Sequence, residues 1–324
     1  MDKVIGLGNA LVDILATMKN DTLLTRLNLP KGSMQLVDSE TSVNILNALD
    51  GIETSQISGG SASNTIHGLA QLGIETAFIG KVGNDHFGQF FKTDMEKCGI
   101  NTCLFESKTE SGRAIALISP DSERTFATYL GAAVELSASD ITEELFLGYK
   151  YLHIEGYLVF NQDLVRKAVV MAKKLGMIIS LDLASYNVVD ANREFLQEIT
   201  ENYIDIIFAN EEEGKSFTAL EGEEALNKMA EIVTIAVYKQ GKNGSLIKSK
   251  NTISRIDAIK ANSIDTTGAG DLFASGFLYG LIHGYPLEKC AKIGSITAGN
   301  VVQVIGPKMN ETQWSLIRET IIQL

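Results

Sequence analysis

The chain reads Asp265-Thr-Thr-Gly-Ala-Gly-Asp-Leu-Phe-Ala-Ser-Gly-Phe277 near its C-terminus. Two carboxylates bracket a Gly-Ala-Gly turn, which opens directly into an apolar run that extends to Ile282. The pattern predicts a loop that becomes a helix N-terminus, where free backbone N–H groups form an anion site. Asp271 would lie on the first turn of that helix. A carboxylate beside an anion site indicates phosphoryl transfer, because the amides hold the moving phosphate while the acid takes a hydroxyl proton.

Strand-like and helix-like segments alternate in the C-terminal half of the chain. Such alternation predicts a parallel sheet with helices on both faces. The predicted strands are 151–154, 178–183, 204–209 and 232–238. The predicted helices are 162–175, 192–202, 222–231, 268–284, 286–304 and 311–323.

The N-terminal half mixes this pattern with shorter strands. A buried strand is expected at 4–7 and another at 76–79, with helices at 61–72 and 85–98. The additional strands are 11–18, 34–37, and a hairpin of 114–118 with 124–129, while 19–33 is polar and irregular. These additions predict a small separate sheet, formed by about 11–37 and 104–130, that acts as a lid. The whole of 1–324 is expected to be one domain.

Composition narrows the class of protein. The chain has 324 residues, 45% of them hydrophobic, a net charge of −12 and a pI near 4.9, which argues against nucleic acid or anionic membrane as a partner. The three cysteines are odd in number and form no CxxC pair, and the four histidines lack metal-ligand spacing. With no signal-peptide pattern and no apolar stretch of about 18 residues, a cytoplasmic protein is expected.

Two familiar nucleotide-binding motifs fail. The dinucleotide fingerprint GxGxxG has Leu11 at its third glycine, which disfavours a nicotinamide oxidoreductase. The P-loop pattern fails at Gly80, because Val82 follows Lys81, and at Gly241, because Asn243 follows Lys242. An ATP site in this chain must therefore use other chemistry, and 265–271 is the candidate.

Four motifs together resemble those of the ribokinase, or PfkB, family of carbohydrate and nucleoside kinases, and the resemblance spans essentially the whole chain. They are the C-terminal signature at 265–271, the N-terminal signature Gly59-Gly-Ser-Ala-Ser-Asn64, the NxxE element Asn210-Glu-Glu-Glu213 and the opening turn Gly8-Asn-Ala-Leu-Val-Asp13. Three stretches are similar to adenosine-kinase-like members: 9–14, 123–133 and 154–157. Other family members of this pattern phosphorylate free sugars, as ribokinase and fructokinase do, so the acceptor stays open.

The resemblance implies a three-layer α/β/α core, Rossmann-like in its topology, with a small β-sheet lid. It also implies transfer of the ATP γ-phosphate to a primary hydroxymethyl group with Mg²⁺, and family members often respond to K⁺. The partner would be a small sugar or nucleoside, and the protein would be a monomer or a homodimer. An alternative of another class is a catalytically silent regulator that binds a sugar or nucleoside on the same fold.

Asp271 is the predicted general base, which accepts the proton of the substrate hydroxymethyl. Gly268, Ala269 and Gly270 would supply N–H groups to the transferring phosphate, and the two glycines would also contact the nucleotide. The structural alternative for Asp271 is a helix-capping acid. Asp265 is expected to order the loop rather than to act in catalysis.

Asn210 and Glu213 follow a predicted strand, at the end where ligands of α/β sheets collect. Mg²⁺ prefers hard oxygen ligands and keeps several waters, so these two residues are predicted to bind it through water. A capping box, with Asn210 at the N-cap and Glu213 three residues later, is compatible with that role.

Four residues are predicted to bind the hydroxyls of the substrate: Asp13, Gly59, Gly60 and Asn64. A carboxylate that accepts two sugar hydroxyls orients the acceptor. Arg124 lies on the predicted hairpin and would reach phosphate or substrate, or else be an ordinary exposed arginine.

The nucleotide is expected to contact a second glycine turn, which contains Gly241 and Gly244. The family usually has Thr or Ser before the first of these glycines, whereas this chain has Gln240, preceded by Lys239. Asn300 would line the adenine pocket, or be a polar residue at the edge of the core.

Overall fold

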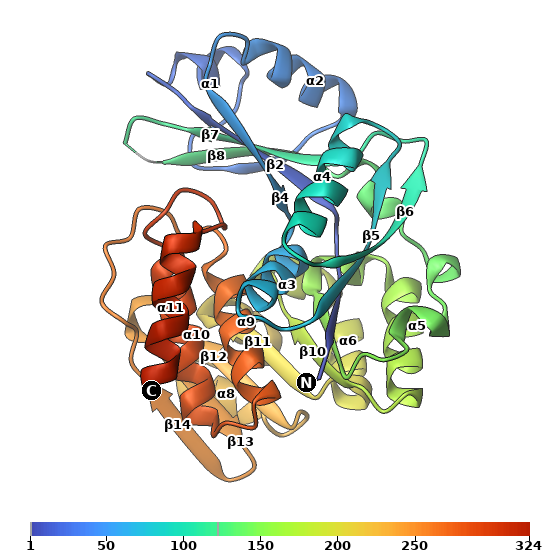
Figure 1. Ribbon diagram of the computed structural model, residues 1–324, viewed down its shortest axis with the longest axis vertical. Helices are drawn as coiled ribbons and strands as arrows, with labels where there is room; N and C mark the ends of the chain where they lie inside the picture. The colour runs from blue at the N-terminus through green and yellow to red at the C-terminus, as the bar shows by residue number, and fades with distance from the viewer. Residues whose placement is uncertain (1, 122) are drawn as a thin grey trace.

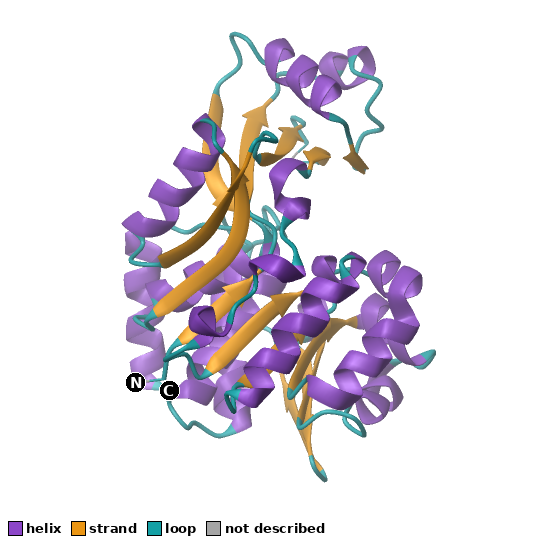
Figure 2. Ribbon diagram, turned by 90° about the vertical axis from the view of Figure 1, so that its right-hand side faces the viewer, coloured by secondary structure: helices purple, strands orange, loops and turns teal. Residues whose placement is uncertain are grey.

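The computed structural model describes residues 2–121 and 123–324 as two sheets with helices around them (Figures 1 and 2). The large sheet has the order β14-β13-β12-β11-β10-β9-β1-β5-β6, and its strands from β12 to β6 are parallel. Its strands are β1 (Val4–Leu7), β5 (Thr76–Gly83), β6 (Asn101–Ser107), β9 (Tyr151–Glu155), β10 (Ile178–Asp182), β11 (Ile206–Asn210), β12 (Ile235–Lys239), β13 (Ser245–Ser249) and β14 (Thr252–Ile256).

Helices cover both faces of the large sheet, so the predicted three-layer α/β/α core is confirmed. Successive strand residues point to opposite faces, and Ile206 and Ile207 accordingly belong to two different apolar clusters. The helices on the face of Ile206 are α3 (Ser61–Gln71), α4 (His86–Lys97), α9 (Ala269–Ile282) and α10 (Leu287–Val301), with α11 (Glu311–Gln323) packed outside them. Those on the face of Ile207 are α5 (Gln162–Lys174), α6 (Tyr186–Tyr203), α7 (Glu211–Thr218) and α8 (Gly222–Met229). No helix in the described part of the chain is both long and apolar enough to cross a bilayer.

The second sheet, called the small sheet below, has the order β3-β8-β7-β2-β4. Its strands are β2 (Leu11–Thr17), β3 (Met34–Leu36), β4 (Thr54–Gly59), β7 (Gly112–Ile118) and β8 (Arg124–Tyr129). Two assignments differ from the sequence prediction: β4 joins this sheet unpredicted, and β6 pairs with β5 in the large sheet. The segment predicted as irregular holds α1 (Thr22–Arg26), and α2 (Ser39–Ala48) follows β3. Residue 122, which stands between β7 and β8 in the sequence, lies outside the described residues.

The register of the small sheet places two exposed apolar side chains on the face of Asp13. Asp13 pairs with Ala114, Ala114 with Thr128, and Thr128 with Leu36. Directly paired residues point to the same face, and so do residues two apart in a strand. Leu36 and Met34 therefore share the face of Asp13, with exposed fractions of 70% and 59%.

Close packing of α3 on α9 sets the geometry of the candidate site. A Cβ on Gly68 would lie 2.5 Å from Ser275 Oγ and 2.8 Å from its Cβ, so only glycine allows this approach. The residues that contact Asp271 lie one to two turns before Gly68 on the same helix.

Gly68→Ala is expected to reduce the free energy of unfolding by about 1–3 kcal/mol, because the added methyl forces α3 away from α9. Denaturant unfolding measures the change. Ser275→Gly removes the two nearest opposing atoms and leaves Leu272 Cδ1 at 2.9 Å, so the double variant should lose less stability than the two single changes added together. If the changes in the free energy of unfolding were strictly additive, the side chains at positions 68 and 275 would not be in steric conflict.

Candidate active site

Asp271 lies on the first turn of α9 and is held by α3. Its carboxylate accepts hydrogen bonds from Ser61 Oγ at 2.7 Å and Asn64 Nδ2 at 2.9 Å, and Thr65 Oγ1 donates to its carbonyl oxygen at 3.2 Å. Burial raises the pKa of Asp271 to about 6, while the bonds from Asn64 and Ser61 work against that rise. The carboxylate is therefore fixed in place, and its pKa is suited to a general base near neutral pH.

The turn before α9 has the conformation that an anion site needs. Gly268 has a φ of 76°, and a Cβ there would lie 2.6 Å from the Pro307 Cβ, so this position requires glycine. Among the described residues, the N–H groups of Gly268 and Gly270 find no protein acceptor. Ala269 differs from the prediction, because its N–H donates to the Thr266 carbonyl at 3.2 Å.

Polar groups gather at the carboxyl ends of β10, β11 and β12. Asn210 N and Nδ2 donate to the two carboxylate oxygens of Glu213 at 2.8 and 2.6 Å, and Glu213 N donates to Asn210 Oδ1 at 2.9 Å. This is the reciprocal capping box at the start of α7. Burial raises the pKa of Glu213, and the Lys239 ammonium opposes the shift. Each Glu213 oxygen accepts one of these bonds, and its contact with Mg²⁺ through water stays a prediction. Within residues 2–121 and 123–324, no three His, Cys, Asp or Glu side chains converge as a metal cage.

Asp13 and the two glycines of the N-terminal signature lie together. A Cβ on Gly59 would overlap the Asp13 carboxylate at 2.2 Å, and one on Gly60 would lie 2.3 Å from the Asn9 carbonyl oxygen. Burial raises the pKa of Asp13 to about 7, and the Lys308 ammonium opposes that rise. The glycines thus let β2, β4 and the start of α3 meet around one carboxylate.

Glu155, at the end of β9, is a site residue that the sequence reasoning did not single out. It accepts hydrogen bonds from Asn9 N at 2.9 Å, Asn9 Nδ2 at 2.6 Å and Ala62 N at 3.0 Å. Asn9 Oδ1 and Asn64 Oδ1 are buried and have no partner among the described residues. Buried polar atoms are normally paired, so these two oxygens are ready acceptors for donors on a ligand.

Arg124 contacts the loop before α9 rather than an open pocket. Its guanidinium forms an ion pair with Asp265 and donates to Thr267 Oγ1 at 3.0 Å. Asp265 also accepts from Gly306 N at 2.6 Å and Thr267 N at 2.9 Å. The predicted ordering role of Asp265 matches these contacts. The predicted contact of Arg124 with phosphate or substrate stays a prediction.

The predicted nucleotide residues Gly241, Gly244 and Asn300 lie outside α9, in the turn after β12 and on α10. Gly241 and Gly244 have φ values of 52° and 89° in the turn between β12 and β13. A Cβ on Gly244 would lie 2.0 Å from the Ile256 carbonyl oxygen, so that position requires glycine. Asn300 donates to the Ile296 carbonyl of its own helix at 2.8 Å, and its place in an adenine pocket stays a prediction.

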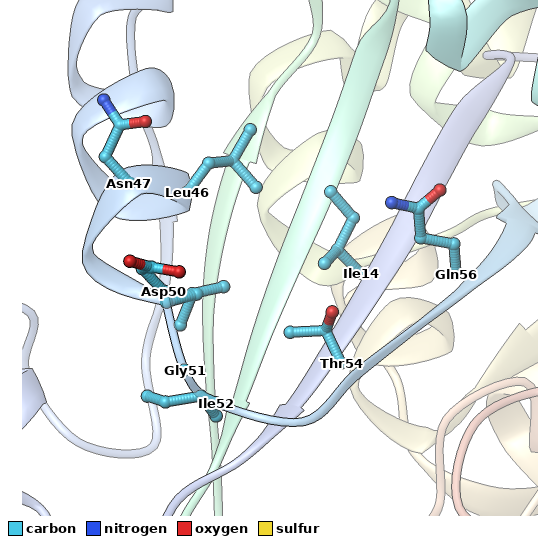
Figure 3. A pocket seen from close by; sticks show the side chains of 9 residues that line it. Ile14, Leu46, Asn47, Asp50, Gly51, Ile52, Thr54 and Gln56 are labelled. Carbon is cyan, nitrogen blue, oxygen red and sulfur yellow. The ribbon is translucent and has the colours of Figure 1, made fainter.

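Two surface hollows differ in their relation to this site. The larger, of about 620 Å³, lies between α2 and the β2–β4 edge, and Ile14, Leu46 and Gln56 help to line it (Figure 3). Ile14 adjoins Asp13 in β2, so it points to the opposite face of the small sheet. The second, called the Asn9 pocket below, has about 500 Å³ and shares Asn9 with the site. Its other lining residues are Ala133, Val134, Leu136, Tyr157, Leu158, Phe160, Asn161, Gln162, Asp163 and Leu164.

Comparisons with known proteins agree with one another. The family model described as pfkB family carbohydrate kinase matches residues 40–313. A 5-dehydro-2-deoxygluconokinase of Bacillus licheniformis is 30% identical over 75% of this chain and 80% of its own, and a nucleoside kinase of Methanocaldococcus jannaschii is 30% identical over 81% and 85%. Among solved structures, a probable sugar kinase of Rhizobium etli has a TM-score of 0.88 with 33% identity, covering 99% of each chain. An adenosine kinase of Sinorhizobium meliloti has a TM-score of 0.87 with 31% identity, covering 98% of this chain and 99% of that one.

The fold, the fixed carboxylate and the glycine turn define a phosphotransferase with an alcohol group as acceptor. The chain belongs to the pfkB family of carbohydrate kinases. It is accordingly a sugar or nucleoside kinase that uses ATP, and none of these comparisons supports the silent regulator.

Asp271→Asn is expected to lower kcat by at least about 100-fold while nucleotide and acceptor still bind, because the amide cannot take the hydroxyl proton. A coupled assay of ADP release and calorimetric binding measure the two effects. Glu288→Gln is the matched control, since Glu288 is an exposed acid in the first turn of α10. If kcat fell only slightly, and by the same factor in both variants, Asp271 would be a helix-capping acid and not the general base.

The pH dependence should report the ionisation of Asp271. Its base form is required and its pKa is raised to about 6, so kcat/KM should fall as pH drops through that value. Ser61→Ala removes a hydrogen bond that lowers this pKa, so the acid limb should move to higher pH. Ser39→Ala is the control, because Ser39 is also the first residue of a helix and donates to a carboxylate, Glu110. If the acid limb of the pH profile stayed in place in Ser61→Ala, that limb would report the ionisation of a group other than Asp271.

Proposed function

We propose that this kinase transfers the γ-phosphate of ATP to the primary hydroxymethyl of a nucleoside, with adenosine as the best candidate. The Asn9 pocket carries the argument, because apolar and aromatic side chains line it together with Asn9, whose side chain is bound to Glu155 in the site. Val134 and Phe160 are 55% and 65% exposed. Exposed apolar side chains at a polar site favour a ligand with an apolar face, and a purine base has one.

The small sheet supplies a second apolar surface. Met34 and Leu36 share the face of Asp13 and are exposed. If the small sheet closes over the acceptor, these side chains would cover a base that rests on Phe160 and Val134. Closure of this kind excludes water and protects ATP from hydrolysis.

The charge of the Asn9 pocket separates a nucleoside from a sugar acid. Its described lining contains one acid, Asp163, and no lysine or arginine. A sugar acid carries a carboxylate that would need a cation or several donors, whereas a nucleoside is neutral. The relatives include both a 5-dehydro-2-deoxygluconokinase and a nucleoside kinase at equal identity, so the pocket rather than the likeness favours the nucleoside.

The reaction follows from the positions of the chain's own groups. Asp13 and the free amide oxygens of Asn9 and Asn64 would orient the acceptor hydroxyls. Asp271 would take the hydroxymethyl proton as its oxygen bonds to the γ-phosphorus and the bond to ADP breaks. The N–H groups of Gly268 and Gly270 would stabilise the charge on the transferred phosphoryl group.

The cofactors are proposed on different grounds. Mg²⁺ fits the strand ends through water, since Asp182 and Glu213 place carboxylates there, and it would neutralise phosphate charge. K⁺ dependence rests on family membership alone. The free thiols Cys98, Cys103 and Cys290 support a reducing compartment, the cytoplasm.

An acceptor panel tests the proposal: purified protein with ATP and Mg²⁺, and adenosine, other nucleosides, ribose, fructose or keto-deoxy sugars. ADP release is expected with adenosine. Phe160→Ala and Leu36→Ser should raise KM for the nucleoside about tenfold and leave KM for ATP unchanged, because they remove contacts with the base. Leu316→Ser is the matched control, as Leu316 is an exposed leucine on α11. Turnover with a sugar alone, unaffected by either pocket variant, would overturn the nucleoside assignment.

A further inference from the structure

We propose that Lys239 is a further catalytic residue, whose ammonium contacts the terminal phosphate groups of the nucleotide beneath the first turn of α9. This inference rests on the proposed phosphate site at α9. It adds a fixed positive charge to a site that otherwise consists of backbone amides and carboxylates.

The position of the ammonium carries the inference. Lys239 is the last residue of β12, and its Nζ donates to Asp182 Oδ2 at 2.7 Å. Both side chains are nearly buried, with exposed fractions of 14% and 7%. A Cβ on Gly270 would lie 3.1 Å from Nζ, and no other heavy atom beyond the adjacent residues and the backbone of its own helix lies within 4 Å of it. The ammonium thus lies directly beside the backbone that would hold the phosphate.

The Lys239 ammonium also has N–H groups that no protein acceptor among the described residues uses. It carries three N–H groups, and among the described residues Asp182 is the one acceptor in hydrogen-bond range. Burial disfavours its charge, but Asp182 and Glu213, with Asp271 further off, reverse that effect and raise the pKa of Lys239. The group therefore stays cationic, with unsatisfied N–H bonds, in a place largely closed to water.

A purely structural ion pair explains these facts less well. A buried pair stabilises a fold little compared with well-packed apolar residues, and this one stands at the end of the sheet where ligands bind. The N-terminus of α9 attracts anions to the same place. Gly270 presents no side chain to separate Nζ from an anion held by the turn. A phosphate oxygen there would complete the coordination of the ammonium.

The stabilisation is greatest where charge develops during transfer. As the acceptor oxygen bonds to phosphorus and the bond to ADP breaks, negative charge shifts onto the leaving phosphate. A cation in a dry site stabilises this charge more than it would in water. Lys239 is not consumed, because the hydroxyl proton goes to Asp271.

The test compares Lys239→Met with Lys239→Arg, and with Lys173→Met as the matched control. Lys173 also forms an ion pair, with Asp205 at 2.6 Å, but at the opposite end of the same strands. Lys239→Met should bind a non-hydrolysable ATP analogue at least about tenfold more weakly, leave the binding of adenosine, which has no phosphate, unchanged, and lose about 100-fold or more in kcat. Lys239→Arg should recover part of both losses, and Lys173→Met should match the wild type.

Two outcomes overturn the inference: unchanged affinity for the ATP analogue in Lys239→Met, or equal weakening of the analogue and of adenosine. If Lys239→Met does not fold, the double variant Lys239→Met/Asp182→Leu replaces both partners by apolar groups and removes the unpaired charge. Wild-type kcat in that double variant would likewise reject the role. A wild-type protein without kinase activity on any acceptor would instead refute the proposed function, and analogue binding would still report on Lys239.

Discussion

The contact between the start of α3 and the start of α9 is the constraint on which the site depends. Ser61 and Asn64 from one helix hold the carboxylate of Asp271 on the other. The two helix N-termini thus converge, and each attracts negative charge. Glu155 uses the same principle, because it accepts the Ala62 N–H in the first turn of α3. Gly68 permits this convergence, so a packing detail in the core determines the geometry of the chemistry.

Gathering carboxylates in a dry place reduces stability at neutral pH. Burial raises the pKa of Asp13 and Glu155 to about 7 and that of Asp271 to about 6. A carboxyl with a raised folded-state pKa stabilises the fold at pH values below its unfolded pKa, near 4. That contribution is lost as pH rises from there to about 7. Lys239 and Lys308 offset part of this cost, since each opposes the shift of a nearby carboxyl. The site therefore needs its buried cations for stability as well as for any contact with ligands.

The sequence predicted those features that depend on neighbours along the chain. The glycine turn, the helix after it and the capping box of Asn210 with Glu213 are local, and so are most strand positions. The sequence did not predict hydrogen-bond partners that are far apart along the chain. Ser61 is 210 residues from Asp271, and Glu155 is 146 residues from Asn9. The approach of Lys239 to Asp182 depends on the strand order β10-β11-β12, which periodicity does not reveal. For the same reason the predicted small sheet, formed in part by 104–130, included residues 104–107 of β6, which pair with β5 in the large sheet.

The small sheet contacts the core through groups that also take part in the site. The carboxylate of Asp13 on β2 packs against the backbone of Gly59, which ends β4 just before α3. Arg124 on β8 is paired with Asp265, three residues before Gly268. Since Asp265 also binds Gly306 N, the hairpin, the glycine turn and the loop after α10 share one carboxylate. Any displacement of β8 must break the ion pair or carry the turn with it. Movement of the small sheet and the shape of the anion site are for that reason mechanically linked.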